Sequence, residues 1–377
     1  TVDGRDVYDY SAGELRETWL VQSAATVSSE EGSLLPEVVS AGQQQQFSVR
    51  LHNSGQAPVI LDETATSLTF GDGSSSYSVL LASQYALPGE SSTRVTFLSA
   101  NVPEGFLPGI YPVTLSLYGT ENGARFDTLM VIPDSVTVVT PADLSYEPST
   151  IIPMTVSKNS TVSFELVIDN TGGATVLLDP TSSQITMSDG AALYAAGLNG
   201  SRTGEIVPGP NTLYFNSAVV EGGFMTGSYT PAVHLEGKEN GIDISSDPVI
   251  SDQISVQEPS LLAINSIEIY PTDRMTADQA AGRAALIRIE NNGEAEVRLD
   301  LLSMRLFIGS VPVSDEYVLT PVDFTPGGEN LAGGQTDSFV VMIADEPSNA
   351  MTTGTVTVEA TVEGTDLNSL EELVATT

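Results

Sequence analysis

The chain has 377 residues, no cysteine, and 49 acidic against 13 basic side chains, which give a net charge of −36. This charge repels nucleic-acid phosphates and anionic lipid headgroups, so we expect neither as a partner. Disulfides and thiol chemistry are excluded, and no apolar run approaches the roughly 18 residues that a membrane span requires.

The first residues resemble the end of a module rather than its beginning. The segment Thr1-Val2-Asp3-Gly4-Arg5-Asp6 is similar to Thr361-Val362-Glu363-Gly364-Thr365-Asp366. After it, the stretch from residue 18 to residue 25 has the pattern of a last strand that runs into a linker. We therefore predict that residues 1–27 are an arm that belongs to a neighbouring module, with an assembly interface at Thr18, Trp19, Leu20 and Val21.

A run of the form Asn-x-Gly-x-Ala-x-Val-x-Leu-Asp occurs at residues 53–62, 170–179 and 291–300. A spacing of about 120 residues is the length of one domain, so the chain is predicted to hold three modules. The expected boundaries are 28–142, 143–260 and 261–377. The repeated turn residues, interpreted as structural because none of them can act on a substrate, are Asn53, Gly55, Asn170, Gly172, Asn291 and Gly293.

Apolar and polar residues alternate with period two on both sides of each repeated turn. In the first copy, Val49 and Leu51 precede the turn, and Val59 and Leu61 follow it. Such alternation puts one face of a strand in a core and the other in solvent. We expect the Asn-x-Gly to supply positive φ angles for a tight connection between strands. Helical spacing is almost absent, which predicts an all-β chain of three tandem immunoglobulin-like β-sandwich domains.

The order of these features resembles that of bacterial and archaeal CARDB-like domains. The likeness is carried by Val49 to Leu61, by Leu87 to Gly89 and by Gly109 to Leu117, with their counterparts in the other copies. CARDB-like domains are immunoglobulin-like modules found in tandem on secreted and cell-surface proteins. The resemblance implies an extracellular or cell-surface location, and a role in adhesion, stalks or surface layers rather than in catalysis.

The third module is predicted to lack its last strand. The last strands of the first two modules are expected at residues 134–139 and 252–256, and the third has no counterpart up to Thr377. Either the next module of a covalent array continues from here, which we favour, or the arm of a neighbouring chain fills the open edge. Both alternatives join copies of the chain head to tail. On the third module, the assembly interface is expected at Leu370, Leu373 and Val374.

Catalytic and cofactor sites have little support in the sequence. His52 and His234 are the only histidines, and each is expected on the outer face of a strand, so we predict no catalytic residue, no cofactor and no enzyme. Calcium is the one candidate ligand, because acidic residues gather near the module junctions. Solvated acidic linkers are the favoured alternative. The candidate calcium ligands are Asp143, Glu147, Asp252 and Glu258.

These features predict a structural subunit of an extracellular filament or surface array. Its sandwiches are expected to assemble head to tail, with strand completion between neighbouring units. The alternative is the stalk or binding region of a secreted adhesin, with a protein or carbohydrate ligand. An adhesin would present exposed aromatic residues in uneven loops, whereas a structural subunit would have similar modules with complementary ends.

Overall fold

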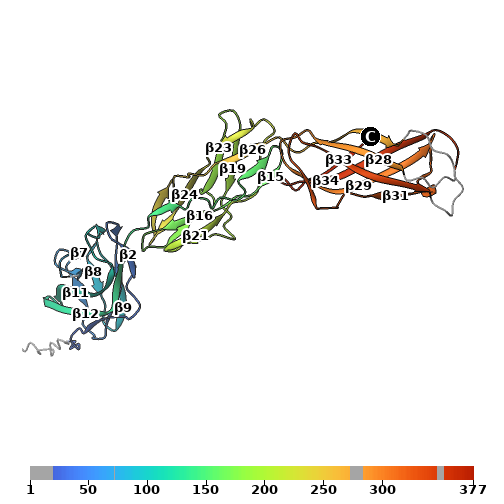
Figure 1. The fold of residues 1–377 in the computed structure, drawn as a ribbon. Coiled ribbons are helices and arrows are strands. Elements are labelled where there is room, and N and C mark those ends of the chain that lie inside the picture. Colours follow the sequence, from blue (N-terminus) through green and yellow to red (C-terminus); the bar gives the residue numbers. More distant parts are fainter. Residues whose placement is uncertain (1–19, 72, 272–282, 346–351) are drawn as a thin grey trace, which may run out of the picture. The chain divides into compact units, whose positions relative to one another are not determined.

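The computed structural model describes residues 20–71, 73–271, 283–345 and 352–377 (Figure 1). The chain divides into two compact units, of which the first is Thr1–Ala142 with the short segments Gly172–Ala174 and Asn240–Ile242. The first unit carries one set of β-sheets and the second carries two. The prediction of an all-β chain of immunoglobulin-like sandwiches is confirmed. In the described residues, no helix is long and apolar enough to cross a membrane.

The first sandwich packs the sheet β1-β4-β9 against a seven-stranded sheet centred on β11 and β12. Alternate residues of β4 face the core, where Val49 and Leu51 are fully buried. The strands are β1 (Val27–Ser29), β2 (Val38–Ser40), β3 (Gln44–Gln45), β4 (Ser48–Asn53), β5 (Val59–Leu61), β6 (Ser67–Gly71), β7 (Ser76–Leu80), β8 (Tyr85–Leu87), β9 (Ser91–Thr96), β10 (Ala100–Asn101), β11 (Gly109–Glu121) and β12 (Ala124–Val139).

The second sandwich repeats this plan, with β16 in the place of β4 and the same alternation of buried residues. Its core contains Phe164, Leu166 and Ile168. The strands are β13 (Leu144–Tyr146), β14 (Thr155–Ser157), β15 (Thr161–Val162), β16 (Glu165–Asn170), β17 (Val176–Leu178), β18 (Gln184–Ser188), β19 (Leu193–Gly197), β20 (Glu205–Ile206), β21 (Gly209–Tyr214), β22 (Ala218–Val219), β23 (Gly227–Tyr229), β24 (Ala232–Glu239), β25 (Ile242–Ser246) and β26 (Ile254–Gln257).

The third sandwich packs the sheet β27-β28-β33-β31 against the sheet β30-β29-β34-β35 (Figure 1). Ile287 and Ile289 of β28 face Ala360 and Val362 of β34 in one core. The elements are β27 (Leu262–Tyr270), β28 (Arg283–Asn291), β29 (Val297–Ile308), β30 (Val311–Pro312), the 3₁₀ turn η1 (Ser314–Glu316), β31 (Tyr317–Pro321), β32 (Glu329–Leu331), β33 (Thr336–Asp345), β34 (Val356–Asp366) and β35 (Glu372–Thr376).

Candidate functional site

The repeated asparagine holds the chain that enters each sandwich. The Oδ1 atom of Asn291 accepts a hydrogen bond from the backbone N–H of Leu261, at 3.0 Å. The corresponding bonds run from the N–H of Thr26 to Asn53 and from the N–H of Asp143 to Asn170, each at 3.2 Å. All three asparagines are buried. The same polar contact therefore fixes the linker at the start of every sandwich.

The other end of the asparagine side chain ties the linker to two further loops. The Nδ2 atom of Asn291 donates to the carbonyl oxygens of Ala295, at 2.7 Å, and Leu331, at 3.1 Å. Its Oδ1 atom also accepts from the N–H of Gly293. Buried backbone groups must find partners, and one buried amide satisfies four of them here. The asparagine is thus the centre of a joint rather than only a turn residue.

The repeated glycine has a different role from the expected one. Gly55, Gly172 and Gly293 do not have positive φ angles. A Cβ atom on them would instead lie 2.0, 1.9 and 2.0 Å from a carbonyl oxygen of the linker, the residues concerned being Ala24, Pro141 and Pro259. Our interpretation of positive φ was therefore wrong. The glycine is required because the linker backbone lies directly against it.

A carboxylate completes the joint. Asp366 is buried, and it accepts hydrogen bonds from the backbone N–H and the Oγ atom of Ser260, both at 2.7 Å. Burial disfavours its charged form, but the hydrogen bonds from Ser260, with those from the N–H groups of Ser369 and Asn368, lower the pKa of Asp366 overall. In the first sandwich, Glu121 accepts from the N–H of Ala25 at 2.9 Å.

Sequence reasoning missed this carboxylate, although a signal for it exists. Glu121, Glu239 and Asp366 each stand two residues after a strand glycine, Gly119, Gly237 and Gly364. Glu239 is also buried, as its place in this pattern predicts. The position is buried in the second and third copies and partly buried in the first. An acidic residue that returns at such a position indicates a partner in the fold rather than a solvated surface.

In the second unit, the joint also reaches the sandwich before it. The Nδ2 atom of Asn368 donates to the Oε1 atom of Gln257, at 2.8 Å, and to the Oγ atom of Ser157, at 3.3 Å. Ser157 is fully buried at the end of β14. In the first unit, Asn122 makes the corresponding bond to Gln22, at 3.3 Å.

Two of the candidate calcium ligands have other partners. The carboxylate of Asp252 accepts hydrogen bonds from the Tyr146 hydroxyl, at 2.5 Å, and from the N–H of Ser149, at 2.8 Å. The carboxylate of Asp143 accepts from the Oγ1 atom of Thr171, at 2.9 Å. Each side chain fastens a loop of the second sandwich.

The other two candidates do not meet them in a cluster. Glu258 forms an ion pair with Lys158, at 2.5 Å, and Glu147 takes part in its loop through backbone atoms, accepting from Thr150. Across the described residues, no three His, Asp or Glu side chains are grouped so that they could hold a metal ion. The calcium hypothesis therefore has no ligand cluster in that part of the chain.

The residues predicted for assembly are mostly exposed where the structure describes them. Leu20 and Val21 lie in solvent before the first sandwich, and Leu370 and Val374 are exposed near β35. Leu373 instead packs against the third core. Thr18 and Trp19 fall outside the described residues.

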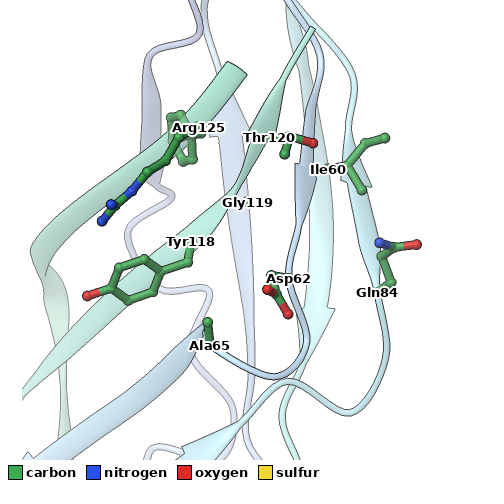
Figure 2. Close-up of a pocket in the computed structure, with 9 residues that line it drawn as sticks. Ile60, Asp62, Ala65, Gln84, Tyr118, Gly119, Thr120 and Arg125 are labelled. Atoms are coloured by element: carbon green, nitrogen blue, oxygen red, sulfur yellow. The ribbon is translucent and has the colours of Figure 1, made fainter. Parts of the chain in front are cut away.

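A pocket of about 360 Å³ lies on the outer face of the first sandwich, over Gly119 (Figure 2). In this view, the side chains of Tyr118 and Arg125, from β11 and β12, point to the left of Gly119, and Asp62 lies to its right. A pocket of about 590 Å³ occupies the corresponding place over Gly237 in the second sandwich. There, Glu236 and Asp243 replace the tyrosine and the arginine, so the two pockets have different chemistry.

The sequence matches no protein-family model and no curated protein. Among solved structures, it is similar to a marsupial T cell receptor, at 14% identity and a TM-score of 0.31 over 94% of this chain and 99% of that one. Titin domains I67–I69 give 11% identity and a TM-score of 0.26, with 94% and 98% covered. The eight N-terminal immunoglobulin domains of Down syndrome cell adhesion molecule give 11% and 0.24, with 93% and 36% covered. At these values the likeness carries no information on ligand or activity.

Proposed function

We propose that this chain is a structural subunit of an extracellular filament or surface array, built from CARDB-like sandwiches that follow one another head to tail. The observation that carries the proposal is the repeated joint. Asn53, Gly55 and Glu121 hold Ala24 to Thr26 at the start of the first sandwich, as their counterparts hold the linkers of the other two. A joint that fixes the linker in this way serves to connect the sandwich to another one on the other side of the linker.

The charge supports an exterior location. A net charge of −36 repels other acidic macromolecules and attracts cations, so close packing of such chains is favoured in a medium that supplies salt. The core of each sandwich is made of apolar side chains without any cysteine, so its stability does not depend on the redox state of the surroundings.

The test is the state of the purified full chain at physiological salt. We expect strings of sandwiches in electron micrographs, and a mass by light scattering that rises with protein concentration. A variant that begins at Gln22 keeps the joint residues and serves as the control, which should remain a monomer. Isolated monomers of the full chain at every concentration would overturn the proposal.

A second candidate function rests on the pocket in Figure 2. Tyr118 offers a partly exposed ring that points to the same side as the Arg125 side chain, and Asp62 lines the pocket as well, which suits a polar ligand with an apolar face. In that case the chain would be the binding region of an adhesin. A glycan or peptide that binds the full chain and fails to bind Tyr118→Ala would support this alternative, and Leu177→Ala in the second pocket is the control.

A further inference from the structure

We propose that the pocket over Gly119 binds a guanidinium group, and that the group belongs to an arginine side chain of a partner protein. The guanidinium stands between the carboxylate of Asp62 and the hydroxyl of Thr120, and its aliphatic stem lies against Ile60. The inference names the ligand class of the second candidate function. It rests on that function and does not depend on head-to-tail assembly.

The third sandwich holds a guanidinium group of its own at the corresponding place. The Nε atom of Arg298 donates to the Oδ1 atom of Asp300, at 2.8 Å, and its Nη2 atom donates to the Oγ1 atom of Thr365, at 3.4 Å. The hydroxyl of Thr365 donates in turn to the Oδ2 atom of Asp300, at 2.5 Å. These bonds, that of Arg298 first, lower the pKa of Asp300. A carboxylate and a hydroxyl thus form a binding pair for a guanidinium group.

The first sandwich has the same two partners but an isoleucine in place of the arginine. Asp62 closes the repeated run in the first copy, as the aspartate that binds Arg298 does in the third. Thr120 lies opposite Ile60 in the sheet, as Thr365 lies opposite Arg298. Asp62, Thr120 and Ile60 all line the pocket of about 360 Å³. The pocket therefore lies where the third sandwich holds its own arginine.

The polar groups of the pocket can accept further hydrogen bonds. The backbone N–H and the Oγ1 atom of Thr64 donate to the Oδ1 atom of Asp62, at 2.8 and 2.7 Å, so the Oδ2 atom can accept from a ligand. Thr120 is exposed, and its hydroxyl oxygen has two acceptor lone pairs. Ile60 is 46% exposed, and it offers the stem of an arginine an apolar surface.

Arg125 also lines the pocket, and its charge opposes a cationic ligand. In Figure 2 its side chain points to the left of Gly119, whereas Asp62 and Thr120 lie on the other side. Arg125 forms an ion pair with Asp127, at 3.4 Å, which offsets part of its charge. Removal of the Arg125 charge should therefore strengthen the binding of a guanidinium group and weaken that of an anion.

The pocket of the second sandwich differs at the position of the hydroxyl. Lys238 stands there in the place of Thr120, and its ammonium group pairs with Asp243. Since a cation already lies beside this pocket, we expect no guanidinium site over Gly237. The second pocket is therefore an internal control for the first.

The test is titration of the full chain with N-acetyl-arginine amide, followed by NMR. Salt at roughly 0.3 M screens the net charge of −36, which attracts any cation. N-acetyl-citrulline amide is the matched ligand, because a neutral urea replaces its guanidinium, and it should bind at least about tenfold more weakly. Asp62→Asn should weaken binding roughly tenfold. Glu37→Gln removes an equal charge outside the pocket and should leave binding unchanged.

Two further substitutions test the place and the sign of the ligand. Ile60→Arg supplies the guanidinium from the chain itself, so it should abolish binding, whereas Leu177→Arg makes the same change in the second pocket and should leave binding unchanged. A melting temperature of Ile60→Arg at or above that of the wild type shows that this variant is folded. Arg125→Gln should strengthen binding roughly twofold to fivefold, because a like charge is removed.

Equal binding of the two amides, or weaker binding to Arg125→Gln, would overturn the inference. A glycan or peptide that needs Tyr118, in a chain that ignores the arginine amide, would leave the binding function standing and show that its ligand class is wrong. Ile60→Arg should self-associate as the wild type does. Loss of self-association would exclude a foreign partner and assign the arginine to a second copy of the chain.

Discussion

A single asparagine connects three loops at the start of each sandwich, so its loss should be costly. In Asn291→Ala, the N–H of Leu261 and the carbonyls of Ala295 and Leu331 lose their partner in a buried place. We expect the third sandwich to lose about 2–4 kcal/mol of unfolding free energy, because buried polar groups without partners are expensive. Chemical denaturation measures the loss. Asn292→Ala is the control, since that side chain is exposed.

The adjacent glycine should tolerate no side chain. In Gly55→Ala, the new Cβ atom would meet the carbonyl oxygen of Ala24 at 2.0 Å, so the linker backbone must move. We expect a loss of about 1–3 kcal/mol in the first sandwich by calorimetry, as for overpacked sites. In Gly105→Ala, the new Cβ atom meets nothing within 4 Å, and this variant should match or slightly exceed the wild type. Equal stability of the two variants would contradict the close-approach argument.

At the scale of elements, His234 ties β24 to the residues that follow β25. Its Nδ1 atom lies 2.7 Å from a carboxylate oxygen of Asp247, and its Nε2 atom lies 3.1 Å from one of Glu236. The carboxylates stand at opposite ring nitrogens, so they stabilise the imidazolium rather than share a metal ion with it. These hydrogen bonds, that of Asp247 first, raise the pKa of His234 above 6.5.

The raised pKa has a defined pH dependence. Protonated His234 stabilises the second sandwich fully below pH 6.5, and the contribution is lost as the pH rises through the folded-state pKa. An NMR titration of the imidazole should show Asp247→Asn lowering the pKa toward its ordinary value. Asp243→Asn, whose carboxylate pairs with Lys238, should leave the titration unchanged. An equal response to both substitutions would show that the pair with Asp247 does not hold in solution.

The strands could be predicted from the sequence, whereas the role of the repeated glycine could not. Alternation at Val49 and Leu51, or at Val59 and Leu61, is local, and it predicts strands correctly because one face of each is buried. The role of Gly55 depends on the linker at Ala24, which approaches it only in the folded chain. The sequence therefore marked the joint as a turn but could not show which backbone lies against it.

The partners of the candidate metal ligands depend on the fold in a similar way. Asp252 and Glu258 are close in sequence, but one fastens Ser149 and the other pairs with Lys158. Composition indicates how many carboxylates a region of the sequence holds. It does not indicate which hydrogen-bond donors or cations the fold brings to each carboxylate. The carboxylate of Asp366 recurs as an acidic residue in every copy, so the sequence marks its position. Its partner Ser260 lies more than a hundred residues away, and the sequence does not show that the two meet.

At the scale of the whole molecule, a net charge of −36 opposes both compact folding and the packing of one copy against another. Screening lengths fall from about 30 Å at 0.01 M salt to about 3 Å at 1 M, so added salt should relieve both effects. We expect the melting temperature and the size of the assemblies to rise together between these concentrations, as followed by calorimetry and light scattering.

A comparison of calcium chloride with sodium chloride at matched ionic strength distinguishes general screening from binding of calcium at a specific site. If screening alone acts, calcium adds little beyond sodium chloride, whereas saturable stabilisation by micromolar calcium would require a built cation site and would restore the calcium hypothesis.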